Sequence, residues 1–403
     1  MNTLLFALMR ALRVHRWLRL LLGALVLSSV GNGLTQVLVF GLLLDWQAPP
    51  STLTLAYMLA TLPGFLGSLV GEKLCQSISP ARLLILTETL GLAALSLPLL
   101  GLLHHSITAL LLVQSVEALL GGMSWPALAL LFKRGLSAHE LSAATAMETT
   151  IFASQVLLGT GIGVLLFGTV DPRLLLAIDA LSFLAAIILL VLTSLTYRTH
   201  HDKHREDGEV SVRLSWALLS RRQKRSLLIL PVLAAVGSPA MALMPALVQQ
   251  IQPDHATALA LPLLFARSLG QLCGPLLLDS KKLPGYASRN RVLLMCMGIF
   301  LGAYGLVPLV AGQLAAISGL IFVAHLASNV LFAVGTFSLL AGFSIAQVSA
   351  ASARAWRWQT ITATVVTATA AVLAASWGAM QALYSVSLGA LLLAALVMHR
   401  YRQ

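Results

Sequence analysis

The sequence predicts an all-α membrane protein with twelve transmembrane helices in two six-helix halves, and three observations support this fold class. Apolar residues make up 58% of the 403 residues and charged residues only 10%, well below the roughly 25% of a soluble domain. About a dozen stretches of roughly twenty residues nearly lack charged side chains, and this length crosses a ~30 Å hydrocarbon core. No stretch alternates apolar and polar residues, so the spans are helices rather than barrel strands.

The expected spans follow one another with mostly short connections. They are residues 18-44, 52-72, 83-103, 106-132, 140-168, 174-196, 226-250, 257-278, 291-311, 313-342, 358-377 and 379-398. Residues 1-17 precede the first span as an amphipathic segment at the cytoplasmic surface, because no small-residue cleavage site marks a signal peptide. Residues 399-403 form a short cytoplasmic tail.

Basic residues collect on one side of the predicted membrane. Of the 26 Lys and Arg residues, 24 fall in the termini or in the connections that follow even-numbered spans. Cytoplasmic loops are enriched in Lys and Arg, so both termini are expected in the cytoplasm. One missed span would scramble this asymmetry, which supports the count of twelve. The net charge of +12 therefore reflects topology and attraction to anionic lipid rather than nucleic-acid binding.

One long polar segment, residues 197-225, separates a first half at 18-196 from a second half at 226-398. It contains His200, His201 and His204, which could hold a metal ion but fit a solvated basic linker better. Six spans, a polar linker and six further spans are typical of secondary transporters whose binding site lies at the midplane between related halves.

Five Asp, Glu, Lys or Arg side chains lie more than two residues inside the ends of the predicted spans: Glu88, Glu117, Glu148, Asp179 and Arg267. A charge at the bilayer centre costs about 2.5–3.5 kcal/mol on insertion scales, so each should face the bundle interior and have a partner or water. Glu88 and Asp179 lie near span ends. Structural roles are favoured for both: Glu88 reaches toward Arg82 or the connection after the second span, and Asp179 pairs with Arg173 or caps a neighbouring helix.

Glu117 and Arg267 are each about ten residues from either end of their spans, too deep to reach an interface. Gly121, Gly122 and Pro126 follow Glu117 and weaken its helix beside a cavity. We expect both charged residues to face a central cavity, where Arg267 binds an acidic group and Glu117 exchanges a proton. A direct ion pair that the substrate must break, or a purely structural Glu117, are the alternatives.

Further polar residues inside the spans complete the candidate substrate-binding or coupling site: Asn32, Gln36, Glu148, Gln155, His325 and Asn329. The pairs in the first and tenth spans are four residues apart and therefore share one helix face. The alternative role for such residues is hydrogen bonding between helices, worth about 0.6 kcal/mol on average. A histidine can also relay protons.

Charges at the cytoplasmic ends of the spans form a candidate gate. Glu72 precedes Arg82 by ten residues after the second span, and Asp279 precedes Arg289 by ten after the eighth. The repeated spacing is a weak internal echo between the halves. The candidate gating residues are Glu72, Lys73, Arg82, Asp279, Lys281 and Arg289.

Three strings in the first half carry a family resemblance. They are "SWPALALLFKRGLSAHELSAATAMETT" at 124-150, "AIDALSFLAAIILL" at 177-190, and "LPGFLGSLVG" followed by "ARLLILTETL" around the connection after the second span. They resemble the branch of the major facilitator superfamily that contains the enterobactin exporter and the macrolide-efflux proteins. The resemblance implies the major facilitator fold, with two halves that rock about a central site, and it favours export.

The chain departs from the superfamily pattern at its gate and in its fourth span. Where members carry an Asp-Arg pair after the second span, this chain has Gln76 and Ser77, with Glu72 and Lys73 one turn earlier as substitutes. Where proton-coupled drug exporters tend to have an arginine in the fourth span, this chain has Glu117.

The absent motifs limit the function classes. There is no phosphate-binding GxxxxGK[ST] string and no HExxH string, so neither direct ATP use nor an enzyme is expected, and no cofactor or metal. The expected function is proton-coupled export of a small organic molecule, a siderophore or a drug-like metabolite, by a secondary transporter. The alternatives are an importer or lysolipid flippase on the same fold, or a non-transporting protein that kept the scaffold. We expect a monomer in the bacterial inner membrane, with an acidic small molecule, protons and lipid as partners.

Overall fold

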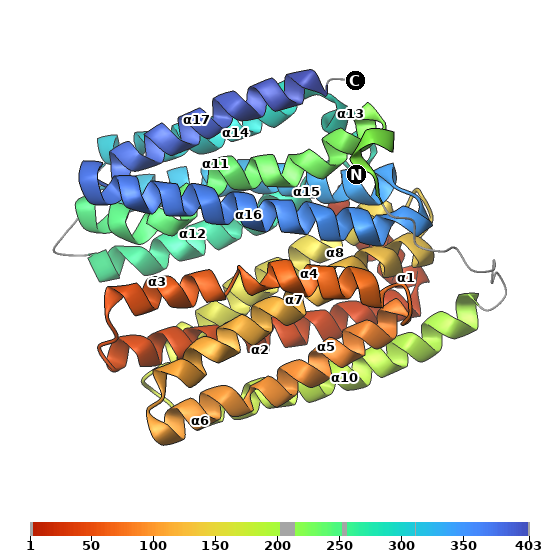
Figure 1. The fold of residues 1–403 in the computed structure, drawn as a ribbon, viewed down its shortest axis with the longest axis horizontal. Helices are drawn as coiled ribbons and strands as arrows, with labels where there is room; N and C mark the ends of the chain where they lie inside the picture. Colours follow the sequence, from red (N-terminus) through yellow and green to blue (C-terminus); the bar gives the residue numbers. More distant parts are fainter. Residues whose placement is uncertain (1–2, 202–213, 252–255, 311, 402–403) are drawn as a thin grey trace. The chain divides into compact units, whose positions relative to one another are not determined.

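The computed structural model describes residues 3-201, 214-251, 256-310 and 312-401, and almost all of these residues are helical (Figure 1). The chain divides into two compact units. The N-terminal unit consists of residues 8-213 and 343-357, and the C-terminal unit consists of residues 1-7, 214-342 and 358-403. Most helices lie wholly within one of the two units.

The first half of the chain forms the helices of the N-terminal unit, except that α1 begins in the C-terminal unit. Prolines begin α3, α4 and α5, because proline fits the first helical turn, where its missing N–H is not needed. In chain order the helices are α1 (Leu4–Val14), α2 (Arg16–Asp45), α3 (Pro50–Leu59), α4 (Pro63–Leu74), α5 (Pro80–Ala94), α6 (Ser96–His104), α7 (Ile107–Gly135), α8 (Leu141–Ala153), the π-helix η1 (Ser154–Thr160), α9 (Gly161–Leu166) and α10 (Pro172–His201).

The second half forms the C-terminal unit, together with the larger part of α16, whose first residues belong to the N-terminal unit. Its elements are η3 (Trp216–Leu218), α11 (Arg221–Ile251), α12 (Ala256–Leu276), η5 (Ser280–Lys282), α13 (Leu283–Ser288), α14 (Asn290–Leu306), η6 (Val307–Val310), α15 (Leu314–Gly342), α16 (Ile345–Trp377) and α17 (Ala379–Arg400).

The same pattern of helix pairs occurs in both units (Figure 1). In the N-terminal unit α2 packs along α10, α4 packs along α7, and α5 contacts both α7 and α10. In the C-terminal unit α11 packs along α17, α12 packs along α15, and α14 contacts both α15 and α17. Helices that occupy the same order in each half of the chain therefore form the same pairs, which supports an internal repeat.

The number of helices that are long and apolar enough to cross a membrane is smaller than predicted, and two predicted spans account for the difference. Ten helices of the described residues are long and apolar enough to cross a membrane, whereas the sequence predicts twelve spans. The predicted span 52-72 is divided between α3 and α4, because Pro63 begins a new helix. The predicted span 257-278 corresponds to α12, which is not among the ten. The count of twelve and the two six-helix halves stay predictions.

Helix also occupies both ends of the predicted linker at 197-225. α10 continues to His201 and α11 begins at Arg221. Residues 202-213, which include His204 of the predicted histidine cluster, lie outside the described residues.

Glycines allow α4 and α7 to approach each other closely. A Cβ atom at Gly67 would collide with the backbone oxygen of Leu119, and a Cβ at Gly122 would collide with the backbone oxygen of Gly64. Small residues in membrane helices permit this close backbone contact. Its van der Waals packing holds the helices together, because the hydrophobic effect does not drive helix association in lipid. The position of α7 therefore depends on these glycines.

Two adjacent glycines in α7 give a stability prediction. We expect Gly122→Ala to lower the free energy of unfolding by about 1–3 kcal/mol, because overpacking forces the backbones apart. Gly121→Ala should have no such cost, because a Cβ there meets no atom within 4 Å and alanine favours the helix by up to about 1 kcal/mol. Thermal unfolding of the purified proteins in one detergent measures both. Equal effects of the two substitutions would contradict the close contact.

Candidate functional site

The middle of α7 carries buried polar atoms that have no partner. Glu117 has a buried Oε1 without a hydrogen-bond partner among the described residues. Gln114, one turn earlier on the same face, is 2% exposed, and its Nε2 is also unpartnered in that part of the chain. Next to Gly121, one turn later, there is open space for a side chain. Leaving such groups unsatisfied costs about 1–3 kcal/mol each, so a structural role explains them poorly.

Polar residues of α2 and of the fifth predicted span lie in the same unit. Glu148 is 7% exposed, and both its Oε2 and the Oδ1 of Asn32 are buried without a partner in the described ranges. Gln36 and Gln155 are half-buried. Gln155 lies in the π-helix η1, and a Cβ at Gly33 would lie 2.5 Å from its backbone oxygen. The α2 backbone therefore packs directly on η1, and π-helical turns occur frequently at functional sites.

Two other carboxylates of the N-terminal unit, the half-buried Glu88 and the buried Asp179, accept hydrogen bonds from hydroxyl groups rather than pairing with arginines. Ser28 Oγ donates to Glu88 Oε2 over 2.6 Å. Thr35 Oγ1 donates to Asp179 Oδ2, and Ser182 Oγ donates to Asp179 Oδ1 over 3.1 Å. The pairings with Arg82 and Arg173 that the sequence analysis favoured do not occur, because α2 lies alongside and offers hydroxyl groups at the depth of the carboxylates. Both residues therefore anchor neighbouring helices to α2.

The C-terminal unit contains a second buried polar cluster. Tyr304 Oη on α14 and His325 Nε2 on α15 are 2.8 Å apart, and these side chains are 2% and 1% exposed. Asn329 Nδ2 donates to the backbone oxygen of His325 over 3.1 Å. The charge of Arg267 on α12 acts on both Tyr304 and His325. Gln271, four residues after Arg267, is 3% exposed. Three helices thus bring a cation, a phenol, an imidazole and two amides into one region.

Glycines in α12 place Arg267 beside this cluster. A Cβ at Gly270 would collide with the backbone oxygen of Phe322, and a Cβ at Gly274 would collide with that of Leu326. The two α15 residues flank His325 in the sequence. The spacing of the glycines in α12 therefore fixes which segment of α15 lies next to Arg267.

An ion pair holds the start of α16 in the N-terminal unit. Arg357 Nη1 donates to Glu72 Oε2 at the end of α4 over 2.7 Å, and the two side chains are 12% and 23% exposed. The ring of Trp356 packs on that of Trp125 of α7, with centroids 4.9 Å apart. A short, largely buried pair of this kind belongs to the stronger class of charge-assisted hydrogen bonds.

The remaining predicted gating residues are not members of this ion pair. Lys73, Arg82 and Arg289 are exposed. Asp279 accepts a hydrogen bond from the backbone N of Lys281 over 3.0 Å and so caps η5. The structure thus brings Glu72 into a contact between distant segments and leaves the other five near the helix ends.

Sequence reasoning missed four residues of these clusters: Gln114, Gln271, Tyr304 and Arg357. Gln114 and Gln271 could have been found, because they lie three and four residues from Glu117 and Arg267 on a shared helix face. Tyr304 and Arg357 could not, because their partners lie on other helices.

A contact between His15 and Glu140, before the start of α8, gives a pH prediction. His15 Nε2 and Glu140 Oε1 are 2.9 Å apart. Burial alone raises the pKa of Glu140, but hydrogen bonds from Ser137 and His15 outweigh it and lower the pKa below its ordinary value. A lowered pKa stabilises the fold above the unfolded value of about 4.3, and this stabilisation is lost as the pH falls through the folded value.

We therefore expect Glu140→Gln to lower the free energy of unfolding by about 1 kcal/mol or less at pH 7, since the pair is partly exposed. The difference from the unchanged protein should shrink as the pH falls through the folded-state pKa of Glu140, and thermal unfolding across this range measures it. Asp45→Asn, at the exposed end of α2, is the control. A difference between Glu140→Gln and the unchanged protein that is independent of pH would show that the carboxylate does not contribute through its charge.

The helices and the two buried clusters define a class before any comparison. Long apolar helices that carry partnerless carboxyl and amide groups in their middle are typical of multi-pass membrane transport proteins rather than of membrane anchors. The family model of the Major Facilitator Superfamily matches residues 20–351. The chain belongs to the major facilitator superfamily and has the fold of its transporters.

Solved structures share this fold over nearly the whole chain. The transporter FucP in an outward conformation is 14% identical, with a TM-score of 0.66, and the match covers 96% of this chain and 98% of FucP. A bacterial homologue of the iron transporter ferroportin, in an outward-facing state, is 17% identical, with a TM-score of 0.66 and the same coverage. The human organic anion transporter MFSD10 is 11% identical, with a TM-score of 0.64, and the match covers 94% of this chain and 98% of that one.

A curated relative is more similar over a shorter stretch. An uncharacterised 29.9 kDa protein of Pseudescherichia vulneris, in the crtE 3' region, is 65% identical over 74 residues. The match covers 18% of this chain and 27% of that protein. The chain thus spans about a quarter of the relative's length.

Proposed function

We propose that the protein is a secondary active transporter that exports a small organic molecule bearing an acidic group, by alternating access and coupled to protons. The observation that carries the proposal is the presence of buried polar and ionisable side chains in the helices of both units, with Tyr304, His325 and Asn329 in direct contact in the C-terminal unit. Apolar side chains would be cheaper at these depths, so each cluster is best explained by a polar solute or an exchanged proton.

The C-terminal cluster supplies the recognition of the solute. Arg267 stays protonated at every physiological pH and forms bidentate hydrogen bonds with carboxylate or phosphate groups. Tyr304 and His325 add a hydrogen-bond donor and acceptor pair. The side-chain amides of Gln271 and Asn329 form hydrogen bonds with polar substituents of the solute. An acidic solute therefore suits this cluster better than a cationic drug.

The N-terminal cluster supplies the coupling. Glu117 and Glu148 each keep a buried oxygen without a partner in the described part of the chain, so a proton can be taken up there without breaking an internal bond. Asn32, Gln36 and Gln155 lie on the neighbouring α2 and η1 and can hold water or solute. Proton exchange at these carboxyl groups links the gradient to the movement of the solute.

The pair between Glu72 and Arg357 acts as the gate on the face that carries most basic residues. Its formation stabilises the state closed on that face, and its loss accompanies opening. Lys73, Arg82, Asp279, Lys281 and Arg289 lie near helix ends and interact with the membrane surface. By the positive-inside rule this face is cytoplasmic, so both termini lie in the cytoplasm. The proposed location is the bacterial inner membrane, and the proposed form is a monomer.

The direction and the solute class follow from the resemblance to the enterobactin-exporter and macrolide-efflux branch. Within that branch a carboxylate-bearing siderophore fits Arg267 better than a macrolide, which is basic. A drug-like acidic metabolite is the other candidate of this class.

Flux in proteoliposomes tests the proposal. Purified protein should move a carboxylate siderophore or acidic drug across the bilayer, and a pH gradient should drive its accumulation. Inside-out vesicles should accumulate the solute if the protein exports it. Absence of flux for the whole panel, with a folded protein and with or without a gradient, would contradict the transporter. Flux that is the same with and without a pH gradient would contradict only the coupling to protons.

A further inference from the structure

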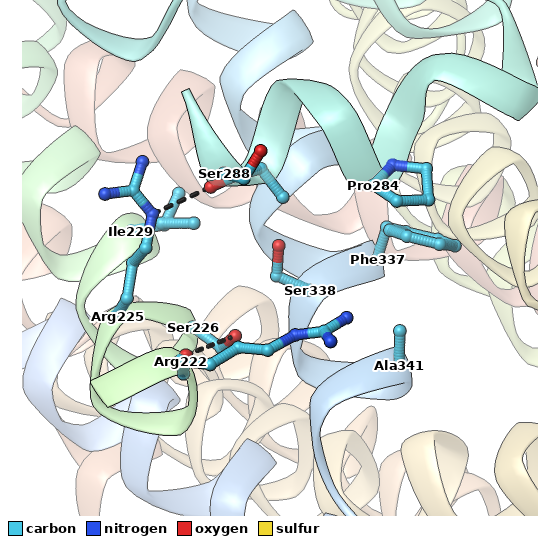
Figure 2. Close-up of a pocket in the computed structure, with 10 residues that line it drawn as sticks. Arg222, Arg225, Ser226, Ile229, Pro284, Ser288, Phe337, Ser338 and Ala341 are labelled. Carbon is cyan, nitrogen blue, oxygen red and sulfur yellow. Dashed lines mark hydrogen bonds between the residues drawn. The ribbon is translucent and has the colours of Figure 1, made fainter. Parts of the chain in front are cut away.

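A small cavity in the C-terminal unit lies away from the candidate transport site. Its volume is about 200 Å³, and it is lined by the first turns of α11, by α13 and by the end of α15 (Figure 2). A water molecule occupies about 30 Å³ in the liquid, so this space holds a phosphate group together with water. The polar side chains of its wall are Arg222, Arg225, Ser226, Ser288 and Ser338.

Arg225 is held rigidly at one side of the cavity. Its side chain is 1% exposed, although it carries a full charge. Nε donates to the backbone oxygen of Ala287 over 2.7 Å, and Nη1 donates to Asn290 Oδ1. Asn290 in turn donates to the backbone oxygen of Met398 over 2.9 Å. The remaining nitrogen, Nη2, is buried and has no partner among the residues described.

No described carboxylate of the C-terminal unit pairs with Arg225. Among the described residues of the C-terminal unit there are ten Lys and Arg residues and one acidic residue, Asp279. Asp279 is occupied by the backbone N of Lys281 and lies 3.9 Å from the ammonium of Lys282. A buried guanidinium without an anion is costly, so an anion from outside the chain is the simplest way to satisfy Arg225.

The other polar residues of the cavity wall have complementary chemistry. Arg222 lies in the first turn of α11, one turn before Arg225. Its guanidinium extends along the cavity toward Ala341 in Figure 2. Ser226, Ser288 and Ser338 each donate to a backbone oxygen of their own helix, over 3.1, 2.9 and 2.7 Å. Such hydroxyl groups can rotate to donate to a ligand instead.

We propose that this cavity binds a phosphate-type oxyanion, which contacts the guanidinium of Arg222 and is attracted by the fixed, buried charge of Arg225 in the cavity wall. The group comes either from the head of an anionic phospholipid or from a soluble phosphate compound. The cavity lies where basic residues gather at the ends of α11, α13 and α14, which is where anionic head groups are attracted. The binding tightens the packing of α11 on α13 and α15 and so stabilises the C-terminal unit.

Thermal unfolding of the full-length protein in a neutral detergent tests the site with three additives. Inorganic phosphate tests the soluble source, phosphatidylglycerol in mixed micelles tests the lipid source, and phosphatidylcholine is the uncharged control. We expect a concentration-dependent rise of Tm with phosphate, with phosphatidylglycerol or with both, and none with phosphatidylcholine. A response to phosphatidylglycerol alone assigns the group to lipid. A response to phosphate alone assigns it to a soluble compound.

Substitutions then locate the effect. Arg222→Gln should raise the half-saturating concentration about tenfold or more, because a charge-assisted hydrogen bond is lost. Arg221→Gln removes the same charge from the preceding residue, which is exposed and outside the cavity lining, and should leave the response nearly unchanged. Ala341→Leu keeps both arginines but fills the cavity, and should abolish the response.

Several results would overturn the site. One is the absence of any Tm response to both phosphate and phosphatidylglycerol. Another is an equal loss in Arg221→Gln and Arg222→Gln, which would mean unspecific attraction to a basic surface. A full response in Ala341→Leu would place the anion elsewhere. Arg225→Gln is informative only if it folds, so the decision rests on Arg222→Gln and Ala341→Leu.

Discussion

Replacing Arg267 by alanine should weaken solute binding at least about tenfold and lower transport in the same proportion. The reason is the loss of charge-assisted hydrogen bonds to the acidic group of the solute, worth about 1.5–3 kcal/mol, where 1.4 kcal/mol corresponds to a factor of ten. The affinity of Arg267→Lys for the solute should lie between that of the unchanged protein and that of Arg267→Ala, because lysine keeps the charge but loses the bidentate geometry. Binding of a carboxylate siderophore to purified protein, followed by flux in proteoliposomes, measures both steps.

The control for this substitution is Arg291→Ala, on the exposed surface of α14. It removes one positive charge from the same unit and should leave binding unchanged. Full binding and transport by a folded Arg267→Ala protein would remove the recognition role of the C-terminal cluster. A loss of thermal stability equal to the loss of binding would instead indicate a structural role.

Reversing the charge of Glu72 or of Arg357 should nearly abolish transport, and reversing both together should restore much of it. Each single reversal breaks the 2.7 Å pair and places two like charges together. This destabilises the closed gate by about 1.5–3 kcal/mol, or roughly ten- to hundredfold in population. In Glu72→Arg combined with Arg357→Glu the attraction returns. Initial transport rates of the four proteins form a double-mutant cycle that isolates the pair.

Lys73→Glu is the matched control for the gate, because Lys73 follows Glu72 but is exposed. It changes the charge of the same helix end without touching the pair and should transport normally. A doubly reversed protein that is no more active than the single variants would show that the pair does not control opening.

The sequence predicts most helices well, because a helix that crosses lipid needs about 20 consecutive, mainly apolar residues. The predicted span 106-132 corresponds to α7 at Ile107–Gly135, and 313-342 corresponds to α15 at Leu314–Gly342. The break before Pro63 was visible as a proline, but hydropathy averages over such short interruptions. The π-helix η1 has no simple signature, because it arises from packing on α2. Membership of the major facilitator superfamily is confirmed, whereas the exporter branch stays a prediction.

The sequence identifies isolated polar groups in spans but not their partners. His325 and Asn329 were expected on one face, and Asn329 does bond to the backbone of His325. Glu72 and Arg357 are 285 residues apart, and no local pattern connects them. Asp179 was matched with the nearest arginine in the chain, although a buried carboxylate takes the nearest donor in space, here Thr35 of the neighbouring helix.

The central claim is that the middle of α7 faces water during the transport cycle rather than lipid. Its most direct test is the labelling of Glu117→Cys by a water-soluble maleimide, after replacement of Cys75, Cys273 and Cys296 by serine. We expect labelling that the transported solute slows, whereas Leu112→Cys, at a 48% exposed position of the same helix, should stay unlabelled in the membrane. If Cys at 117 resists the reagent from both sides of the membrane while an exposed loop cysteine at His139 reacts, the site is sealed from water and the account is wrong.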